Sequence, residues 1–252
     1  MSVPTYLPYY VLAGTAAIIV TLLYGLNEAL AKADWPTQDR ARVMRWSAVI
    51  LLGWFTAAVA LGAGGAYRVD QEAIPTIQYG IFLPILIGGL LIWRSSVVGR
   101  IIDAVPQQWI VSIQLYRALG VIFLILYATG KLPGMFAWPA GVGDIAVGLL
   151  APVVGVAYAR SPRASAGLVS AWNIFGILDL VVAVGTGFIT TPSQLQPFAV
   201  EPPNELIGQF PLVLIPTYLV PLSIMLHLAS LAKLRRSAAE DRGRAELALS
   251  RA

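Results

Sequence analysis

The sequence predicts an all-α fold: a polytopic integral membrane protein built as a bundle of seven transmembrane helices, with the N-terminus outside and the C-terminus in the cytoplasm. Only 12% of the 252 residues are charged, against about 25% in an ordinary soluble domain, and the mean hydropathy is +0.74. Seven apolar stretches are separated by loops that differ strongly in their Lys and Arg content. This composition excludes a soluble globule, and the absence of Cys excludes a disulfide-stapled scaffold.

The seven apolar stretches are the predicted spans. A helix needs about 20 apolar residues to cross the bilayer, and the stretches that qualify are residues 7–30, 46–66, 77–93, 112–130, 139–158, 167–188 and 211–231. We therefore expect residues 1–234 to form a single transmembrane domain and residues 235–252 to form a charged cytoplasmic tail. The first stretch is expected to stay in the membrane, because no Lys or Arg precedes it and it is too long for a signal peptide.

The distribution of basic residues predicts the orientation. Fourteen of the 17 Lys and Arg residues lie in the loops and tail on one side of the predicted bundle, and two, Arg68 and Lys131, lie on the other. Cytoplasmic loops of membrane proteins are enriched in Lys and Arg, so the basic side, which includes the C-terminus, is predicted to face the cytoplasm. The net charge of +4 follows from this topology and predicts a lipid bilayer, and no nucleic acid, as the partner.

The first three spans contain glycines that would let helices pack closely, among them Gly62, Gly88 and Gly89. Residues 97–110 mix charged and apolar side chains around a proline, which is typical of a strip in the membrane interface. The loop 190–209 on the outer side is long enough to be either a functional lid or a plain linker. The tail has helical spacing, which suits a short solvated helix that extends span seven. Alternatively, its Arg residues bind anionic lipid head groups.

Spans four and five contain charged residues that a bilayer disfavours. Gln114 and Arg117 lie three residues apart on one face of span four. In span five, Gly141, Asp144 and Gly148 fall on one side of the helix, so that a partner helix could approach closely enough to bind the carboxylate. Arg117 could instead extend its side chain toward the cytoplasmic surface.

Spans six and seven add further polar residues. Asn173 and Asp179 lie on either side of the face marked by Gly176. Burying an ionised Asp near mid-membrane costs about 3 kcal/mol or more unless it is paired or protonated. Span seven has three prolines at five-residue steps, followed by a polar stripe that includes His227, the single histidine. A lone helical His is more often a hydrogen-bonded core residue than a ligand. Thr217 lies between two of these prolines.

The predicted depths suggest that Arg117 and Asp179 form a charge pair. Their spans run in the same direction, and their vertical offset is about 8 Å at about 1.5 Å rise per residue. An extended Arg side chain could bridge this offset if spans four and six are neighbours. The residues expected to form a site for a small ligand or a proton are therefore Gln114, Arg117, Asp144, Asn173, Asp179, Thr217 and His227.

Most familiar chemistries lack the residues they need. One His and no Cys exclude a structural zinc site, an iron-sulfur cluster and a bis-His haem. The three lysines lie at span ends or in loops, so none could hold retinal, although seven spans with the N-terminus outside resemble a rhodopsin. Paired-aspartate diphosphate and Walker A motifs are also missing. We expect no metal and no cofactor.

The second half of the chain resembles a group of uncharacterised bacterial multi-pass membrane proteins. The resemblance covers residues 107–234 and rests on the strings YRALGVIFLILYATGKLPGMFAWPAGVGDIAVGLLAP, WNIFGILDLVVAVGTG and PLVLIPTYLVPLSIMLHLASL. It implies a bacterial inner (plasma) membrane and no particular activity.

Three functions fit the sequence. In the first, spans four to seven bind or translocate a small solute or protons. In the second, the protein is an enzyme for a lipophilic substrate, with Asp144 or Asp179 as the general acid and Arg117 or His227 as its charge partner. In the third, the buried polar residues only fix helix packing in a structural or assembly subunit. Access to the site distinguishes the three functions. An enzyme for a lipid needs a lateral opening between helices, a transporter needs water to reach the site from both faces alternately, and a structural subunit needs neither.

Overall fold

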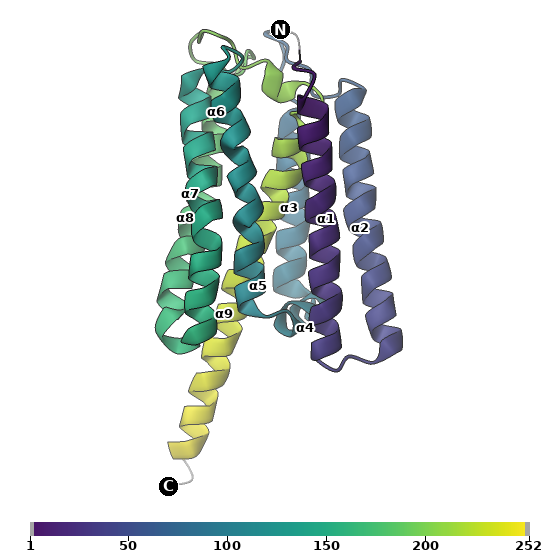
Figure 1. Cartoon of the computed structure of the whole chain (residues 1–252), viewed down its shortest axis with the longest axis vertical. Helices are drawn as coiled ribbons and strands as arrows, with labels where there is room; N and C mark the ends of the chain where they lie inside the picture. Colours follow the sequence, from purple (N-terminus) through teal and green to yellow (C-terminus); the bar gives the residue numbers. More distant parts are fainter. Residues whose placement is uncertain (1–2, 250–252) are drawn as a thin grey trace.

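The computed structural model describes residues 3–249, and this part of the chain is all α, 80% helical and without strands. Residues 1–2 of the predicted domain and 250–252 of the predicted tail lie outside the described range. The helices stand side by side, with the two chain ends at opposite ends of the bundle (Figure 1). The elements are α1 (Leu7–Lys32), α2 (Thr37–Ala63), α3 (Ile77–Arg94), α4 (Ser96–Ala104), α5 (Gln107–Ser112), η1 (Ile113–Gly120), α6 (Val121–Ala128), α7 (Gly134–Arg160), α8 (Pro162–Thr190), η2 (Leu206–Gly208), η3 (Ile215–Leu219) and α9 (Val220–Leu249).

Within residues 3–249, seven helical segments are long and apolar enough to cross a membrane, one for each predicted span. Span four corresponds to α5, η1 and α6 together, and span seven to η3 and α9. Several helices extend beyond the predicted limits: α2 begins at Thr37 and α7 at Gly134, with Pro139 inside the helix. Hydropathy marks the apolar part of a helix, whereas a helix continues through polar residues as long as its backbone hydrogen bonds do.

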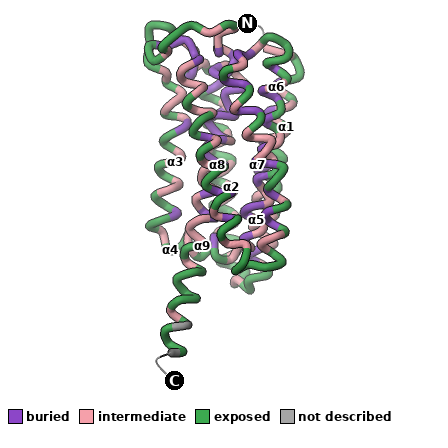
Figure 2. Tube along the Cα trace, turned by 90° about the vertical axis from the view of Figure 1, so that its left-hand side faces the viewer, coloured by how far each residue is buried: buried purple, intermediate pink, exposed green. Residues whose placement is uncertain are grey.

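The buried residues gather inside the bundle (Figure 2), and many of the side chains exposed on the helices are large and apolar. On α3, Leu86 is 67% exposed and Ile87 is 59% exposed, and Leu149 of α7 and Val181 of α8 are similar. Soluble monomers rarely expose contiguous apolar surface of this extent. The surface is therefore of the kind that a lipid environment would cover.

Glycines bring α2 and α3 close to the segment that forms span seven. A Cβ atom at Gly62 would lie 2.8 Å from Val213, and one at Gly88 would overlap the side chain of Met225 on α9. Gly89 is different, because a Cβ atom there would make ordinary contact with Leu228 at 3.8 Å. The predicted packing role is thus confirmed for Gly62 and Gly88, which allow a separation that a larger residue would prevent.

Two of the spans contain a segment that departs from α-helical geometry. The segment η1 is a 3₁₀-helix in span four, and η3 is a π-helical segment at the start of span seven. Pro216 lies in η3 and Pro221 follows it in α9, and proline cannot donate the backbone hydrogen bond that an α-helix requires. Irregular turns of this kind are frequent at functional sites.

The short helix α4 is held against α9 at the end of the bundle near the C-terminus (Figure 1). Lys233 donates to the carbonyl oxygens of Ile102, Asp103 and Val105, and Arg236 forms an ion pair of 2.8 Å with Asp103. A cation at a helix C-terminus is favourable, because it meets unpaired carbonyl groups. Helix α9 continues to Leu249, so the described part of the tail extends span seven as a helix, as its spacing predicts.

At the opposite end, the loop between α8 and η2 packs on the loop that follows α2. The amide of Gln194 donates to the carbonyl of Ala73 at 3.2 Å, and the fully buried Asn204 donates from Nδ2 to Thr190 Oγ1 at 2.9 Å. The two loops together form the rim of a cavity.

Candidate functional site

Arg117 lies at the centre of a buried polar cluster, on the 3₁₀-helix η1. A 3₁₀-helix has 3.0 residues per turn, so side chains three apart lie directly above one another. Gln114, Arg117 and Gly120 accordingly share one face, and all three are buried. The sequence spacing predicts that these three residues share one face, and the 3₁₀ geometry aligns them more closely than an α-helix would. The Arg117 guanidinium therefore lies inside the bundle.

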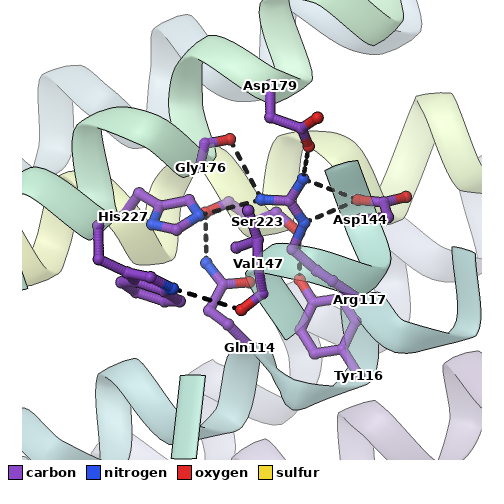
Figure 3. Close-up of polar contacts among 10 residues, drawn as sticks. Gln114, Tyr116, Arg117, Asp144, Val147, Gly176, Asp179, Ser223 and His227 are labelled. Atoms are coloured by element: carbon purple, nitrogen blue, oxygen red, sulfur yellow. Dashed lines mark hydrogen bonds and ion pairs between the residues drawn. The ribbon is translucent and has the colours of Figure 1, made fainter. Parts of the chain in front are cut away.

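Every nitrogen atom of the Arg117 guanidinium has a partner (Figure 3). Nε donates to Oδ1 of Asp144 at 2.8 Å, and Nη2 contacts the same oxygen at 2.7 Å and also Oδ2 of Asp179. Nη1 donates to the carbonyl oxygen of Gly176 at 3.1 Å and lies 3.3 Å from Nε2 of His227. Only 1% of the Arg117 side chain is exposed, so it does not extend to the cytoplasmic surface.

The predicted pair of Arg117 and Asp179 is therefore confirmed, and Asp144 joins it. η1 and α8 each pack mainly on α7, and the Arg117 side chain spans the remaining distance to α8, where it contacts the backbone carbonyl of Gly176 as well as Asp179. The long Arg117 side chain contacts the carboxylate of Asp144 on α7 and also reaches that of Asp179 on α8. One guanidinium thus binds two carboxylates.

Glycines make room for each carboxylate. A Cβ atom at Gly120 would overlap the carboxylate of Asp144, and one at Gly143 would overlap that of Asp179. The close approach predicted from Gly141 and Gly148 is also present, since a Cβ atom at Gly148 would lie 2.5 Å from the backbone nitrogen of Ala118. Gly143 is a residue that the sequence analysis missed, because its partner lies on another helix.

His227 of α9 extends the cluster away from the carboxylates. Its imidazole packs where a Cβ atom at Gly176 would be, and it is fully buried. Because Arg117 can only donate, Nε2 of His227 must accept, and Nδ1 then carries the proton and donates to Oδ1 of Asn173 at 2.9 Å. This pattern assigns a neutral imidazole with its proton on Nδ1.

Asn173 continues the chain of hydrogen bonds toward the end of the bundle that holds α4. Its Nδ2 donates to Oγ of Ser230 at 2.7 Å, and Nε2 of Gln107 donates to the same oxygen at 2.6 Å. All three residues are buried. A lateral branch links Gln114 to the carbonyl of Ser223 at 3.0 Å and the Tyr116 hydroxyl to the Ser223 hydroxyl at 2.5 Å.

Two of these residues have an acceptor without a partner. Oε1 of Gln107 and Oε1 of Gln114 are buried and have no hydrogen-bond partner within residues 3–249. An unpaired buried acceptor is costly, at about 1 to 3 kcal/mol. Gln107, Tyr116, Ser223 and Ser230 were not among the expected site residues, although Ser223 and Ser230 belong to the polar stripe of His227.

Thr217 is the one expected site residue that the structure keeps apart from the others. Its hydroxyl donates to the carbonyl oxygen of Val213 at 2.7 Å, within the same turn of span seven. Its methyl group lies where a Cβ atom at Gly80 of α3 would be. Thr217 therefore satisfies the irregular backbone near Pro216 and packs against α3.

A cavity of about 690 Å³ lies beside the cluster. Asp144 lines its inner end, its walls are mainly apolar, and its rim is formed by residues 65–76 and 191–193. The carboxylates are the accessible part of the cluster, since 16% of the Asp144 side chain and 9% of the Asp179 side chain are exposed. The part of the chain that the structure describes contains no group of three or more His, Cys, Asp or Glu residues arranged to hold a metal ion.

Comparison with known proteins identifies the family of the chain but assigns no activity to it. A family model described as a domain of unknown function (DUF8737) matches residues 74–235, which is more than half of the chain. The match includes every residue of the polar cluster. Searches of curated proteins and of solved structures found no match. The chain belongs to the DUF8737 family.

Proposed function

We propose that this member of the DUF8737 family is a seven-helix membrane protein that binds and translocates a proton or a small cationic solute at the Arg117 cluster. The observation that carries the proposal is that two carboxylates share one buried guanidinium beside a cavity. The proposed orientation has the N-terminus outside and the C-terminus in the cytoplasm, in the inner membrane of a bacterium.

The membrane setting is supported by the surface and by the charge distribution. The outward apolar side chains of α3, α7 and α8 would be covered by lipid. Within residues 3–249, Arg68 and Lys131 are the basic residues of the loops at the end near the N-terminus, whereas thirteen lie in the helix ends at the other end of the bundle and in the extension of α9. This asymmetry favours a cytoplasmic location for the end that carries α4.

The charge count of the cluster favours uptake of a positive charge. With both carboxylates ionised, Arg117, Asp144 and Asp179 together carry one negative charge, and His227 is assigned as neutral. An uncompensated buried charge costs several kcal/mol, and carboxylates that share a site tend to share a proton. A proton or a cation would neutralise the cluster, so the site is suited to bind either one.

The contacts of the two carboxylates indicate which one takes the proton. Asp144 accepts from both Nε and Nη2 of Arg117, whereas Asp179 contacts Nη2 alone. A guanidinium stabilises the ionised form of the carboxylate that it binds more extensively. We therefore assign the proton to Asp179.

Translocation needs access from both sides. On the N-terminal side, the cavity reaches Asp144 from the rim. On the other side, the hydrogen-bonded chain of His227, Asn173, Ser230 and Gln107 leads toward the end that holds α4. Arg117 cannot supply the proton, because a guanidinium is not deprotonated in proteins, so Nε2 of His227 must first separate from Nη1 of Arg117. The neutral imidazole can then accept a proton at Nε2 and release the one on Nδ1 toward Asn173.

A second candidate is supported by the apolar walls of the cavity. A carboxylic acid at the end of an apolar cavity of this size suits general acid catalysis on a lipophilic substrate. Such an enzyme would convert a lipid without moving protons across the membrane. A purely structural subunit would do neither.

Proton flux into liposomes tests the proposal. The purified protein is reconstituted with a pH-sensitive dye inside, a pH difference is applied, and the rate of dye response is measured. We expect flux for the native chain, and its loss for Asp179→Asn. Asp103→Asn is the matched control, because Asp103 also pairs with an Arg but is exposed at the end of the bundle. A native rate equal to that of empty liposomes would overturn proton translocation.

A further inference from the structure

The cavity is far larger than a proton needs. Its volume of about 690 Å³ lies within the range of about 300 to 1,000 Å³ that is typical of small-molecule sites. Phe123, Phe136, Leu180 and Val184 contribute to walls that are mostly apolar. A ligand that fills this space must therefore present an apolar body.

The charge at the inner end of the cavity determines which polar group a ligand can place there. Asp144 lines the inner end of the cavity, and both of its contacts with Arg117 are made by Oδ1, which leaves Oδ2 without a hydrogen bond to residues 3–249. The Arg117 guanidinium is only 1% exposed and does not line the cavity. A ligand entering the cavity therefore meets a carboxylate, which attracts a cation and repels an anion.

The rim has the same bias. Asp70 and Glu72 lie there with Arg68, so the rim has one more acidic than basic side chain. Surface charges of this kind raise the local concentration of the oppositely charged ligand at low salt. Rim and inner end both favour a cation.

We propose that the cavity binds an amphiphilic organic monocation, with its ammonium group at Oδ2 of Asp144 and its apolar body against the aromatic and aliphatic walls. The inference rests on the proposed function and names its ligand class. The ammonium group neutralises the cluster in place of the proton on Asp179, so that one proton leaves for each cation that binds. The exchange is balanced in charge, and no bond other than the O–H bond of the carboxyl group is broken.

Calorimetry with three matched probes tests the ligand class. The full chain in lipid nanodiscs is titrated with 4-phenylbutylamine, with the neutral 4-phenylbutanol and with the anionic 4-phenylbutyrate, and empty nanodiscs correct for partition into lipid. We expect the amine to bind at least about tenfold more tightly than the alcohol, which is about 1.4 kcal/mol, and the carboxylate not to bind. Equal binding of amine and alcohol, or binding of the carboxylate, would overturn the inference.

Variants assign the binding to this cavity. Asp144→Asn should remove the preference for the amine and leave alcohol binding unchanged, whereas Asp103→Asn should change neither. Ala183→Trp should abolish binding of both probes, because Ala183 lines the cavity and is not part of the cluster. Unaltered amine binding by both Asp144→Asn and Ala183→Trp would place the ligand elsewhere and contradict the inference.

Proton release separates this inference from the proposed function. Titrations in two buffers of different ionisation enthalpy count the protons released, and we expect one for each amine and none for the alcohol. If the liposomes show proton flux but the amine binds no better than the alcohol, the ligand class is wrong and the proposed function stands. If the amine binds through Asp144 without proton release, the cation site stands and the proton exchange is wrong.

Discussion

Removing the Arg117 side chain should destabilise the protein more than removing either carboxylate. In Arg117→Leu, the ionised Asp144 loses its counter-ion, and Asp179, the Gly176 carbonyl and His227 each lose a hydrogen-bond donor. Breaking a buried ion pair by removing one partner costs about 3 to 5 kcal/mol, because a charge is left uncompensated. We expect a loss of free energy of unfolding in this range.

Asp179→Leu should cost less, because a one-to-one pair of Arg117 with Asp144 remains. The loss is then that of one charge-assisted hydrogen bond, about 1.5 to 3 kcal/mol. In the double variant, Asp179 is absent as well, so the loss of Arg117 leaves no unpaired carboxyl group at that position. The double variant should therefore be more stable than the sum of the single losses predicts, by about 0.5 to 3 kcal/mol.

Unfolding in mixed detergent and denaturant measures all four members of this double-mutant cycle. The matched control is the cycle of Arg236 and Asp103, whose side chains are 33% and 47% exposed. Exposed ion pairs contribute about 0 to 1 kcal/mol, so its coupling should be smaller. Additive losses for Arg117 and Asp179 would refute the pairing and return Arg117 to a position at the cytoplasmic surface.

Three further predictions concern orientation, the carboxyl group and helix packing. An impermeant thiol reagent should label Ala199→Cys and not Ser161→Cys in intact cells, since the chain has no native Cys, and the opposite labelling would reverse the topology. Asp179→Asn should unfold at a higher denaturant concentration than Asp179→Leu, because an amide still accepts from Arg117; equal midpoints would argue against a buried partner. Gly143→Ala should lower the stability by about 1 to 3 kcal/mol, whereas Gly185→Ala, where a Cβ atom meets nothing within 4 Å, should not; equal effects would separate Gly143 from the site.

The apolar stretches predict the seven helices well, because each carries its own signal of length and hydropathy. They predict helix ends less well, because α2 and α7 begin several residues before their apolar stretches. The helical spacing of the tail does predict that it extends span seven, as α9 does to Leu249. The irregular segment η1 is not encoded in the apolar pattern either, and it contains Arg117.

The cluster shows where a single sequence stops being informative. The positions of Arg117 and Asp179 along their helices are sufficient to predict that the two residues pair. It does not give the rotation of a third helix, so neither the contact of Asp144 with the same guanidinium nor the place of His227 follows from spacing. The glycine at 143 has a visible role only once α7 and α8 are side by side, because it accommodates a side chain from the other helix.

Infrared difference spectroscopy tests most directly the central claim that the Arg117 cluster takes up one proton. Spectra of the native protein in lipid are recorded on stepping from acidic to alkaline pH, and the loss of a protonated carboxyl band is followed. We expect one such band from a carboxyl group inaccessible to bulk water, absent in Asp179→Asn and retained in Asp103→Asn. An unchanged band in Asp179→Asn, or no protonated carboxyl band in the native protein, would contradict proton uptake by the cluster.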